Sequence, residues 1–286
     1  MHVLRSWNEI EDWRQTLRKH GQSLGFVPTM GALHPGHLSL VALAQKQCDR
    51  VLMSIFVNPA QFNRSEDLVH YPRTEAADVA MLRNTACDAV FIPDVAEVYG
   101  SSEPGPSPKH YDLGELEIAL EGAHRPGHFQ GVARILDLFF RRIEPEAAFF
   151  GEKDFQQLAV VRRLVETEAL GVRIVGGPTH RESDGLAMSS RNLRLTPEAR
   201  AQAPAIYREL SRLSTSLTPD HWQAELARSV DVLNQFSTLE VEYLEIADRD
   251  QFHPYAGSPD LHQGRWRLFA AVHASGVRLI DNGPIE

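Results

Sequence analysis

Near its N-terminus the chain has an apolar run that ends at a proline and is followed by two glycines and a helical pattern, and few folds accommodate this combination. Residues 23–28 read Ser-Leu-Gly-Phe-Val-Pro, which predicts a short buried strand that stops at Pro28, because proline cannot continue a central strand. Gly31 and Gly36 allow the backbone to turn tightly. Apolar residues at positions 38, 41, 42 and 44 then predict a helix that begins near His37.

The start of that predicted helix is suited to bind a phosphate group. The unpaired N–H groups and partial positive charge of a helix N-terminus favour an anion. His34 and His37 are three residues apart, so both imidazoles can face the same position and donate hydrogen bonds without a fixed charge. The spacing is also compatible with surface or capping histidines beside an ordinary turn, and the pair alone does not decide between these interpretations.

Strand and helix patterns alternate through the first 178 residues. A capping box at residues 6–9 begins a helix that runs to Lys19. Buried strands are predicted at residues 51–57, 89–92, 147–150 and 172–175, and helices at residues 75–86, 131–143 and 154–169. Residues 101–108 contain three prolines and a glycine and predict a surface loop. This alternation favours a parallel α/β sheet with right-handed crossovers.

The remaining residues follow a different pattern, and a Gly-Gly-Pro sequence at 176–178 marks the change. Threonine before proline at 196–197 and at 218–219 predicts the starts of two helices. Strand patterns follow at residues 239–246, 268–273 and 277–280. We therefore expect an α/β protein with a Rossmann-like domain at residues 1–178 and a smaller α+β C-terminal lid domain at residues 179–286.

The composition excludes some classes of function. The formal net charge of −9 and the pI of about 5.8 argue against broad contact with nucleic acid, which needs clustered Lys and Arg. Cys48 and Cys87 have no metal-binding or redox spacing, so we expect buried thiols in a reducing compartment. No apolar stretch approaches the ~20 residues that span a bilayer, and residues 1–11 carry charges where a signal peptide is apolar. The expected location is the cytoplasm.

Three further segments carry groups suited to chemistry. Asn58 and Gln61 follow a predicted strand, where an open α/β sheet binds its ligands, and amides recognise hydroxyls and carboxylates. The glycine-containing loop at 121–131 could close over an anionic substrate. Lys153 stands at a predicted helix start, where a cation can balance charge on a phosphate. A solvent-facing turn, a plain surface loop and a solvated lysine are the alternative interpretations.

Residues 181–192 lie at the predicted domain junction and contain several hydroxyls and arginines. A guanidinium can hold a phosphate through two parallel hydrogen bonds, so this segment is a second candidate for phosphate binding. A polar connection between two domains would have a similar composition. The residues alone leave both interpretations open.

Several of these segments, in the same order, resemble one family. His34-Pro35-Gly36-His37 resembles the His-x-Gly-His signature of the nucleotidylyltransferase superfamily, and the longer string 28–38 is similar to the pantoate–β-alanine ligase (pantothenate synthetase) family. Gly-Glu-Lys-Asp-Phe-Gln-Gln at 151–157 and Met-Ser-Ser-Arg at 188–191 are similar to further motifs of that family, and the resemblance returns at 279–282. Pro35 departs from the family, which usually has an acidic residue there.

The resemblance implies an ATP-dependent condensation of pantoate with β-alanine through a pantoyl adenylate, which yields pantothenate, AMP and pyrophosphate. It implies a homodimer. We expect Mg²⁺ to bridge phosphate oxygens, as in related phosphate chemistry. The sequence does not identify the Mg²⁺ ligands, for which Asp78 and Asp154 are only candidates. The implied catalytic residues are His34, His37, Lys153, Ser189, Ser190 and Arg191. The implied ATP-binding residues are Met30, Gly31, Ala32, Leu33, His34, Pro35, Gly36, His37, Gly151, Glu152, Lys153, Asp154, His180, Met188, Ser189, Ser190 and Arg191. The implied pantoate and β-alanine contacts are Asn58, Gln61, Arg125, His128 and Gln157.

Two other functions share part of this pattern. A nucleotidylyltransferase that acts on a phosphate ester would account for His34 and His37, but not for the neutral amides of Gln61 and Gln157, which suit a small hydroxy acid. A nucleotide-binding regulator without activity would keep the same motifs. Formation of AMP only when pantoate and β-alanine are both present would separate the three functions.

Overall fold

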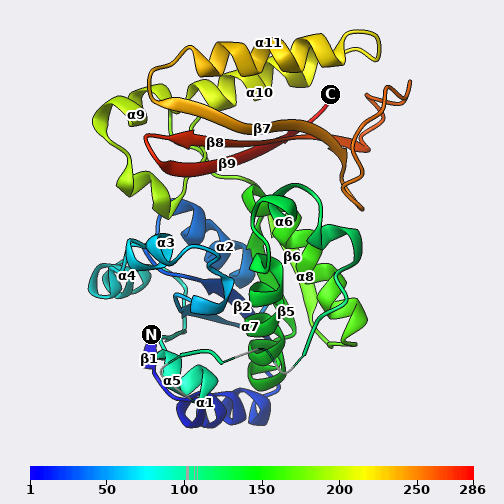
Figure 1. The fold of residues 1–286 in the computed structure, drawn as a ribbon. Helices are drawn as coiled ribbons and strands as arrows, with labels where there is room; N and C mark the ends of the chain where they lie inside the picture. The colour runs from blue at the N-terminus through cyan, green and yellow to red at the C-terminus, as the bar shows by residue number, and fades with distance from the viewer. Residues whose placement is uncertain (101–102, 106, 108) are drawn as a thin grey trace. The chain divides into compact units, whose positions relative to one another are not determined.

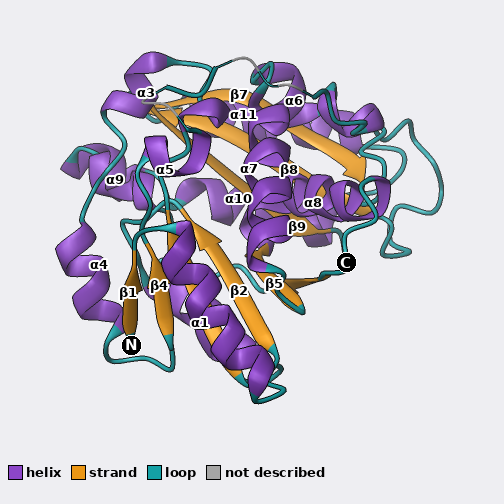
Figure 2. Ribbon diagram, turned by 90° about the horizontal axis from the view of Figure 1, so that it is seen from below, coloured by secondary structure: helices purple, strands orange, loops and turns teal. Residues whose placement is uncertain are grey.

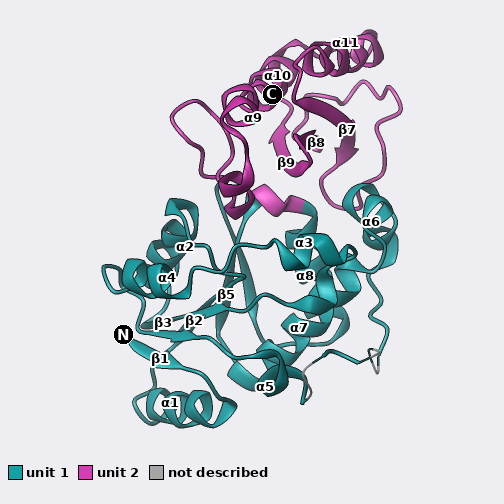
Figure 3. Ribbon diagram, turned by 60° about the vertical axis from the view of Figure 1, so that its left-hand side comes forward, with its two compact units in different colours: residues 1–152, 156–178 teal, residues 153–155, 179–286 magenta. Residues whose placement is uncertain are grey.

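The computed structural model describes residues 1–100, 103–105, 107 and 109–286. These residues divide into two compact units: unit 1 comprises residues 1–152 and 156–178, and unit 2 comprises residues 153–155 and 179–286 (Figure 3). Unit 2 thus includes residues 153–155, a three-residue segment that lies between two parts of unit 1 in the sequence, whereas the expected division at residue 178 has two contiguous domains. The predicted loop at 101–108 lies partly outside the described residues.

Unit 1 is built on a six-stranded parallel sheet with the strand order β1-β4-β3-β2-β5-β6 (Figure 1). The strands are β1 (His2–Leu4), β2 (Leu24–Thr29), β3 (Arg50–Ile55), β4 (Ala89–Phe91), β5 (Ala147–Gly151) and β6 (Arg173–Gly177). The helices are α1 (Trp7–Lys19), α2 (Pro35–Gln45), α3 (Ser65–Val69), α4 (Glu75–Leu82), α5 (Val95–Tyr99), α6 (Leu120–His124), α7 (His128–Ile143) and α8 (Phe155–Thr167), with 3₁₀ turns η1 (Pro59–Gln61), η2 (Gly114–Glu117) and η3 (Glu152–Asp154). Residues 153–155, at the end of η3 and the start of α8, belong to unit 2. The predicted Rossmann-like fold is confirmed.

Different helices cover the two faces of this sheet, because successive side chains of a strand point to opposite faces. Phe26 of β2 and Phe91 of β4 both contact Phe139 of α7, with ring centroids 5.9 Å apart in each pair. Their neighbours Val27 and Val90 belong to a second cluster, which includes buried residues of α2 and α4. Figure 2 shows helices of unit 1 lying across the strands. The sheet is therefore buried on both sides, as a parallel sheet requires.

The centre of the sheet opens between β2 and β5. These strands pair only at Gly25 and Phe26, opposite Ala147 and Ala148, although β2 continues to Thr29 and β5 to residue 151. The chain also crosses from one side of β2 to the other between β4 and β5. Such a switch point, at the carboxyl ends of the strands, is where open α/β sheets bind their ligands.

The prediction that the strand stops at Pro28 is wrong. Pro28 lies inside β2 and pairs in register with Ser54 of β3. On its other side β2 has no partner beyond Phe26, so Pro28 stands where the strand has a neighbour on one side only. Proline is tolerated in such a position because fewer ladder hydrogen bonds depend on its missing N–H.

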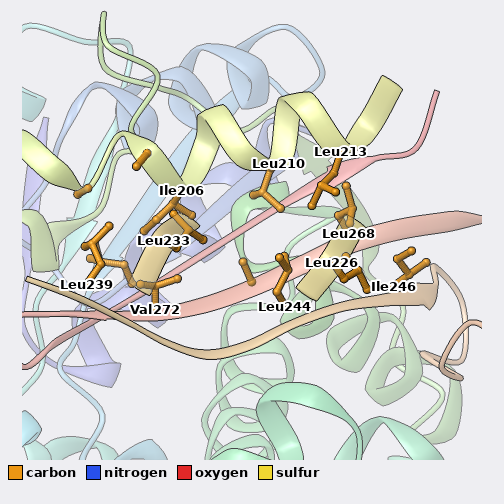
Figure 4. Close-up of a cluster of buried hydrophobic side chains, with 14 of the residues drawn as sticks. Ile206, Leu210, Leu213, Leu226, Leu233, Leu239, Leu244, Ile246, Leu268 and Val272 are labelled. Atoms are coloured by element: carbon orange, nitrogen blue, oxygen red, sulfur yellow. The ribbon is translucent and has the colours of Figure 1, made fainter. Parts of the chain in front are cut away.

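Unit 2 contains an antiparallel sheet with the order β7-β8-β9, covered by helices. The strands are β7 (Leu239–Asp248), β8 (Trp266–Ala274) and β9 (Val277–Pro284), and the helices are α9 (Pro197–Gln202), α10 (Ala205–Ser216) and α11 (Trp222–Asn234), preceded by a 3₁₀ turn η4 (Ser190–Arg194). All three predicted strands are present and are longer than predicted. Leucine and isoleucine side chains of α10 and α11 pack against the strands (Figure 4).

The two predicted helix starts in unit 2 have different outcomes. Thr196 caps α9, since its side chain accepts a hydrogen bond from the N–H of Ala199. The start predicted at Thr218 is wrong, because α11 begins at Trp222 and the preceding threonine and proline lie in a turn. α10 is an additional helix between them, so unit 2 has more helical segments than predicted.

Both cysteines are buried and free, as predicted. Burial raises the pKa of the Cys87 thiol to about 12 and also raises the pKa of Cys48, so both thiols stay protonated at neutral pH. None of the helices in the described part of the chain is long and apolar enough to cross a membrane.

Candidate active site

The turn after β2 is held by a buried carboxylate. Asp78 of α4 is 2% exposed and accepts hydrogen bonds from the N–H groups of Ala32, at 2.9 Å, and Leu33, at 2.8 Å. Gly31 has a φ of +83°, and a Cβ there would lie 2.9 Å from Cγ2 of Ile55. Only glycine therefore fits this position without strain. The result is a fixed turn between the end of β2 and the histidine pair.

The two histidines stand at the start of α2. The helix begins at Pro35, two residues before the predicted start, with His34 as its N-cap. Proline is favoured at the first helical position because its φ is preset and its missing N–H has no partner in a helix. Pro35 is therefore compatible with the start of α2 in this chain. Gly36 occupies the second helical position and, like Met30, lies in the segment expected to contact ATP.

The side chain of His37 has a defined direction. Its Nδ1 accepts a hydrogen bond from the backbone N–H of His34 at 3.3 Å, and the two imidazole rings lie 4.0 Å apart at an interplanar angle of 32°. Because Nδ1 is the acceptor, the proton of a neutral His37 imidazole resides on Nε2. His37 can therefore donate a hydrogen bond to an anion from Nε2.

The buried side-chain amides of Asn58 and Gln61 form a hydrogen-bond network, and backbone groups fix the orientation of the Asn58 amide. The Asn58 amide donates from Nδ2 to the carbonyl of Gly131, at 3.1 Å, and accepts at Oδ1 from the N–H of Ala60, at 3.2 Å. A carbonyl can only accept and an N–H can only donate, so the orientation of this amide is fixed. Nδ2 also donates to Oε1 of Gln61 at 3.0 Å. The Nε2 group of Gln61 is consequently directed elsewhere, 3.0 Å from Sδ of Met30.

Tyr99 completes this network, which the sequence did not reveal. Its hydroxyl donates to Oδ1 of Asn58 at 2.6 Å, and burial raises the pKa of Tyr99 to about 12. Asn58 is 1% exposed and its amide is occupied by protein groups. In this structure Asn58 orients Gln61, which differs from its expected role as a direct ligand contact. The interpretation of Asn58 and Gln61 as a solvent-facing turn is wrong, since Gln61 is only 9% exposed.

His128 holds the same turn from α7. Its Nδ1 lies 2.8 Å from the carbonyl oxygen of Gln61, and its Nε2 lies 3.0 Å from Nη1 of Arg125. Since a guanidinium only donates, Nε2 is the acceptor and Nδ1 carries the proton. Arg125 in turn lies 3.7 Å from a carboxylate oxygen of Glu121. The loop expected to contact substrate therefore also supports the backbone of Gln61.

The two glutamines at the start of α8 differ in their surroundings. Gln156 is 3% exposed and is engaged by backbone groups of the η2–α6 segment, including the N–H of Glu121 at 3.0 Å and the carbonyl of Leu116 at 2.9 Å. Gln157, the predicted pantoate contact, is half-buried. Gly151 and Glu152 lie at the carboxyl end of β5. Gln156 thus has a structural role, and sequence reasoning did not distinguish it from its neighbour.

In unit 2, Lys153 is attached to strand β9. The Asn282 side chain donates from Nδ2 to the backbone carbonyl of Lys153 at 2.7 Å. The Lys153 side chain is 15% exposed, and its ammonium lies 3.8 Å from the carboxylate of Asp154. A lysine at this degree of burial is a compact positive charge with little competition from water.

The segment before η4 forms a short hairpin. The carbonyl of His180 accepts from the N–H of Met188 at 2.9 Å, and Arg181 bridges to Ala187. Arg181 makes a bidentate ion pair with Asp281 of β9, with distances of 2.6 and 2.9 Å. Arg181 also stacks on the ring of Tyr207, at 3.8 Å from its centroid. The hairpin is therefore fixed to the sheet of unit 2 at its base.

The predicted phosphate loop follows this hairpin. Ser189 caps η4, since its Oγ accepts from the N–H of Arg191 at 3.3 Å, which leaves its hydroxyl hydrogen able to donate to an anion. Ser190 is 6% exposed and Arg191 is half-buried. The Asn192 amide donates to the carbonyl of Ala187 at 3.0 Å. The loop thus presents a hydroxyl and a guanidinium on a backbone that hydrogen bonds hold in place.

In the part of the chain that the structure describes, the carboxylates do not form a magnesium-binding site by themselves. The described residues contain no group of three or more His, Cys, Asp or Glu side chains that could hold a metal ion. Both oxygens of Asp78 accept from backbone N–H groups, and Oδ1 also accepts from Thr74, so Asp78 does not fit the role of a metal ligand. Asp154 is a single carboxylate beside the Lys153 ammonium. Mg²⁺ generally keeps several waters and binds through one or two carboxylates together with substrate phosphates.

The comparisons with known proteins agree with the motifs. The family model for pantoate-beta-alanine ligase matches residues 2–284. The pantothenate synthetase of Porphyromonas gingivalis is 45% identical over 283 residues, covering 99% of this chain and 98% of the relative. That of Cereibacter sphaeroides is 46% identical over 279 residues, covering 96% and 95%.

Two solved structures have the same fold as this chain. The pantothenate synthetase of Thermus thermophilus has a TM-score of 0.86 and 38% identity, covering 100% of this chain and 99% of its own. The pantoate-beta-alanine ligase of Francisella tularensis, complexed with beta-gamma ATP and beta-alanine, has a TM-score of 0.84 and 31% identity, covering 99% and 97%. The chain therefore belongs to the pantoate–β-alanine ligase family.

Proposed function

We propose that this chain joins pantoate to β-alanine with the conversion of ATP to AMP and pyrophosphate. The observation that carries this proposal is the family match over residues 2–284, which includes each of the candidate segments. The relative from Francisella tularensis, solved in complex with beta-gamma ATP and beta-alanine, supports ATP and β-alanine as two of the substrates.

The reaction proceeds in two steps and needs no protein nucleophile. A carboxylate oxygen of pantoate attacks the α-phosphorus of ATP, and the bond between that phosphorus and the bridging oxygen breaks, so pyrophosphate leaves. The amine of β-alanine then attacks the acyl carbon, loses a proton, and displaces AMP. The protein contributes by orienting the reactants and stabilising the charge that develops on the phosphates.

Unit 1 supplies donors for the acid and for phosphate. The Gln61 amide is oriented with its acceptor toward Asn58, so its Nε2 group donates to an oxygen of pantoate. Gln157, Arg125 and His128 are the further proposed contacts to pantoate or β-alanine. His37 donates from Nε2 to a phosphate oxygen. Residues 30–36, Gly151 and Glu152 are the further proposed ATP contacts of unit 1.

Unit 2 supplies positive charge and hydroxyls. Lys153, Ser189, Ser190 and Arg191 are proposed to stabilise the transferring phosphate and the leaving pyrophosphate. The ammonium and the guanidinium balance negative charge, while the serine hydroxyls donate hydrogen bonds. The backbone of His180 is proposed to contact the adenine, and Asp154 and Met188 are proposed to contact the nucleotide.

Three remaining features belong to the proposal through the family resemblance. Mg²⁺ would be carried mainly by the phosphates of ATP, because the described carboxylates do not enclose a metal ion. The chain would form a homodimer, which sedimentation at micromolar concentration tests. It would act in the cytoplasm, which cell fractionation tests.

The proposed function is tested by omitting one substrate at a time from the purified protein. Exchange of pyrophosphate into ATP should require pantoate alone, and net AMP should accumulate only with pantoate and β-alanine together. AMP or pyrophosphate formation that ignores pantoate would overturn the proposal and favour another nucleotidylyltransferase. Absence of any turnover would favour a nucleotide-binding regulator.

The assigned roles are tested by single substitutions. His37→Ala and, separately, Lys153→Ala should each lower the rate of adenylate formation by at least ~100-fold, the scale of losing a preorganised charge stabiliser. Both variants should retain the circular dichroism spectrum of the parent. Near-normal pyrophosphate release by either folded variant would contradict the role of that residue.

A further inference from the structure

The side-chain amide of Asn282 lies between the backbone carbonyl of Lys153 and the guanidinium of Arg267, and these two groups fix its orientation. Its Nδ2 donates to the carbonyl of Lys153 at 2.7 Å, and its Oδ1 accepts from Nε of Arg267 at 2.6 Å. A carbonyl only accepts and a guanidinium only donates, so the amide cannot rotate by half a turn without losing both bonds. Asn282 is 3% exposed, which makes the loss of either bond costly.

The same arginine also fixes the residue two positions after Lys153. The guanidinium of Arg267 lies 4.1 Å from the ring centroid of Phe155, and the Phe155 ring contacts those of Phe252, at 6.2 Å, and Phe269, at 6.1 Å. Phe269 pairs in register with Asn282 across β8 and β9. Residues 153–155 are thus held by strand residues of unit 2, which explains why they group with that unit.

We infer that Asn282 is a positioning residue that acts through Lys153. This inference rests on the proposed function, in which the Lys153 ammonium stabilises charge on the transferring phosphate. A lysine ammonium is a point charge at the end of a flexible four-carbon chain, so its placement depends on how firmly the backbone at its base is held. Asn282 supplies that hold through the Lys153 carbonyl. A displacement of about 1 Å at a charged group costs up to ~100-fold in rate, so the contact has kinetic consequences.

The first test is a double-mutant cycle between the two residues, measured as pantoate-dependent pyrophosphate exchange. Asn282→Ala should lower kcat by about 10- to 100-fold while the KM for pantoate changes by less than about 3-fold, because the pantoate contacts are elsewhere. In the Lys153→Ala background, Asn282→Ala should lower kcat by less than about 2-fold, because the ammonium that Asn282 positions is absent. If Asn282→Ala lowers kcat by the same factor with and without Lys153, then Asn282 does not act through Lys153, and the inference is overturned.

A second readout does not depend on activity. Hydrogen–deuterium exchange of the peptide covering residues 152–157 should accelerate by at least about 10-fold in Asn282→Ala, because the segment loses its attachment to β9. Asn234→Ala is the matched control: Asn234, at the end of α11, also belongs to unit 2, but its side chain accepts a hydrogen bond from the N–H of Val241 in β7. The control should leave this peptide unchanged. Unchanged exchange in Asn282→Ala would also overturn the inference.

Asn282→Asp provides the second variant if Asn282→Ala does not fold. The carboxylate keeps an acceptor for Arg267 but cannot donate to the Lys153 carbonyl. The variant should therefore remain folded, show the faster exchange of residues 152–157 and show the same dependence on Lys153. If the parent protein lacks pantoate-dependent exchange, the proposed function fails, and the deuterium measurement still decides whether Asn282 holds the Lys153 segment.

Discussion

Gly131→Ala tests how closely α7 must approach the turn that carries Gln61. An added Cβ at Gly131 would lie 2.1 Å from the carbonyl oxygen of Ala60 and 2.6 Å from Cα of Gln61. Ordinary van der Waals contact begins at about 3.4 Å, so the helix and the turn must separate by about 1.3 Å. The carbonyl of Gly131 also accepts from Asn58, and that hydrogen bond lengthens as the turn moves.

Two consequences of different size are expected from this substitution. Overpacking of this kind costs about 1–3 kcal/mol of stability, which thermal unfolding measures. A displacement of more than 1 Å at Gln61 should lower kcat/KM for pantoate by on the order of 100-fold. The effect on the Kd of ATP should be small, because Gln61 is assigned to the acid.

Gly171→Ala is the matched control. A Cβ at Gly171 meets no atom within 4 Å, and this exposed glycine lies in the connection between α8 and β6. Its substitution should leave both stability and activity close to those of the parent. A Gly131→Ala protein with parental stability and parental kcat/KM for pantoate would refute the packing argument, because the turn would then be shown to tolerate the displacement.

Three other perturbations address the remaining contacts. Asn58→Asp removes the donor to Gln61 and buries a carboxylate, so the free energy of unfolding at neutral pH should fall by about 3 kcal/mol. Part of this loss should be recovered below pH 5, where the carboxyl group is protonated. Urea unfolding at neutral pH and below pH 5 checks both expectations. Tyr99 has a pKa of about 12 in the folded protein and about 10 when unfolded, so between these pH values the folded state keeps a proton that the unfolded state loses. The free energy of unfolding should therefore fall by about 1.4 kcal/mol per pH unit between pH 10 and 12. In Tyr99→Phe this part of the decline should be absent, and an unchanged slope would contradict the assignment. Asp281→Asn removes the charge that pairs with Arg181, and the freed hairpin should raise the KM for ATP by about 5- to 20-fold with little change for pantoate, as initial rates would show.

The sequence predicted the sheet well because buried parallel strands and amphipathic helices leave strong periodic signals. The predicted start or end of an element was wrong where contacts with distant residues outweighed the local sequence pattern. Pro28 stays in β2 because the strand has lost one neighbour at that point, which cannot be read from the residues around it. The start of α11 at Trp222 was missed because a threonine before a proline is also typical of a turn. β1 was missed because three residues are too few to show a period.

Sequence reasoning could single out candidate site residues that lie in one continuous motif. It could not identify a residue that supports the site through a contact with a residue far away in the sequence. The histidine pair, Lys153 and the 188–191 segment each lie in such a motif. Tyr99 contacts Asn58 from 41 positions away, and Asn282 contacts Lys153 from 129 positions away. Neither side chain carries a local signal of its target. Residues 279–282 were recognised as similar to the family, but only the structure indicates what Asn282 holds.

Attack of the pantoate carboxylate on the α-phosphorus of ATP leaves an isotopic trace in the AMP. Pantoate labelled with ¹⁸O in its carboxylate is converted in the presence of ATP and β-alanine, and the AMP is examined by mass spectrometry. Attack by the carboxylate, followed by aminolysis at the acyl carbon, places one ¹⁸O atom in each AMP. AMP that contains no label from pantoate would contradict the mechanism, because the acid would then never have been bonded to the α-phosphate.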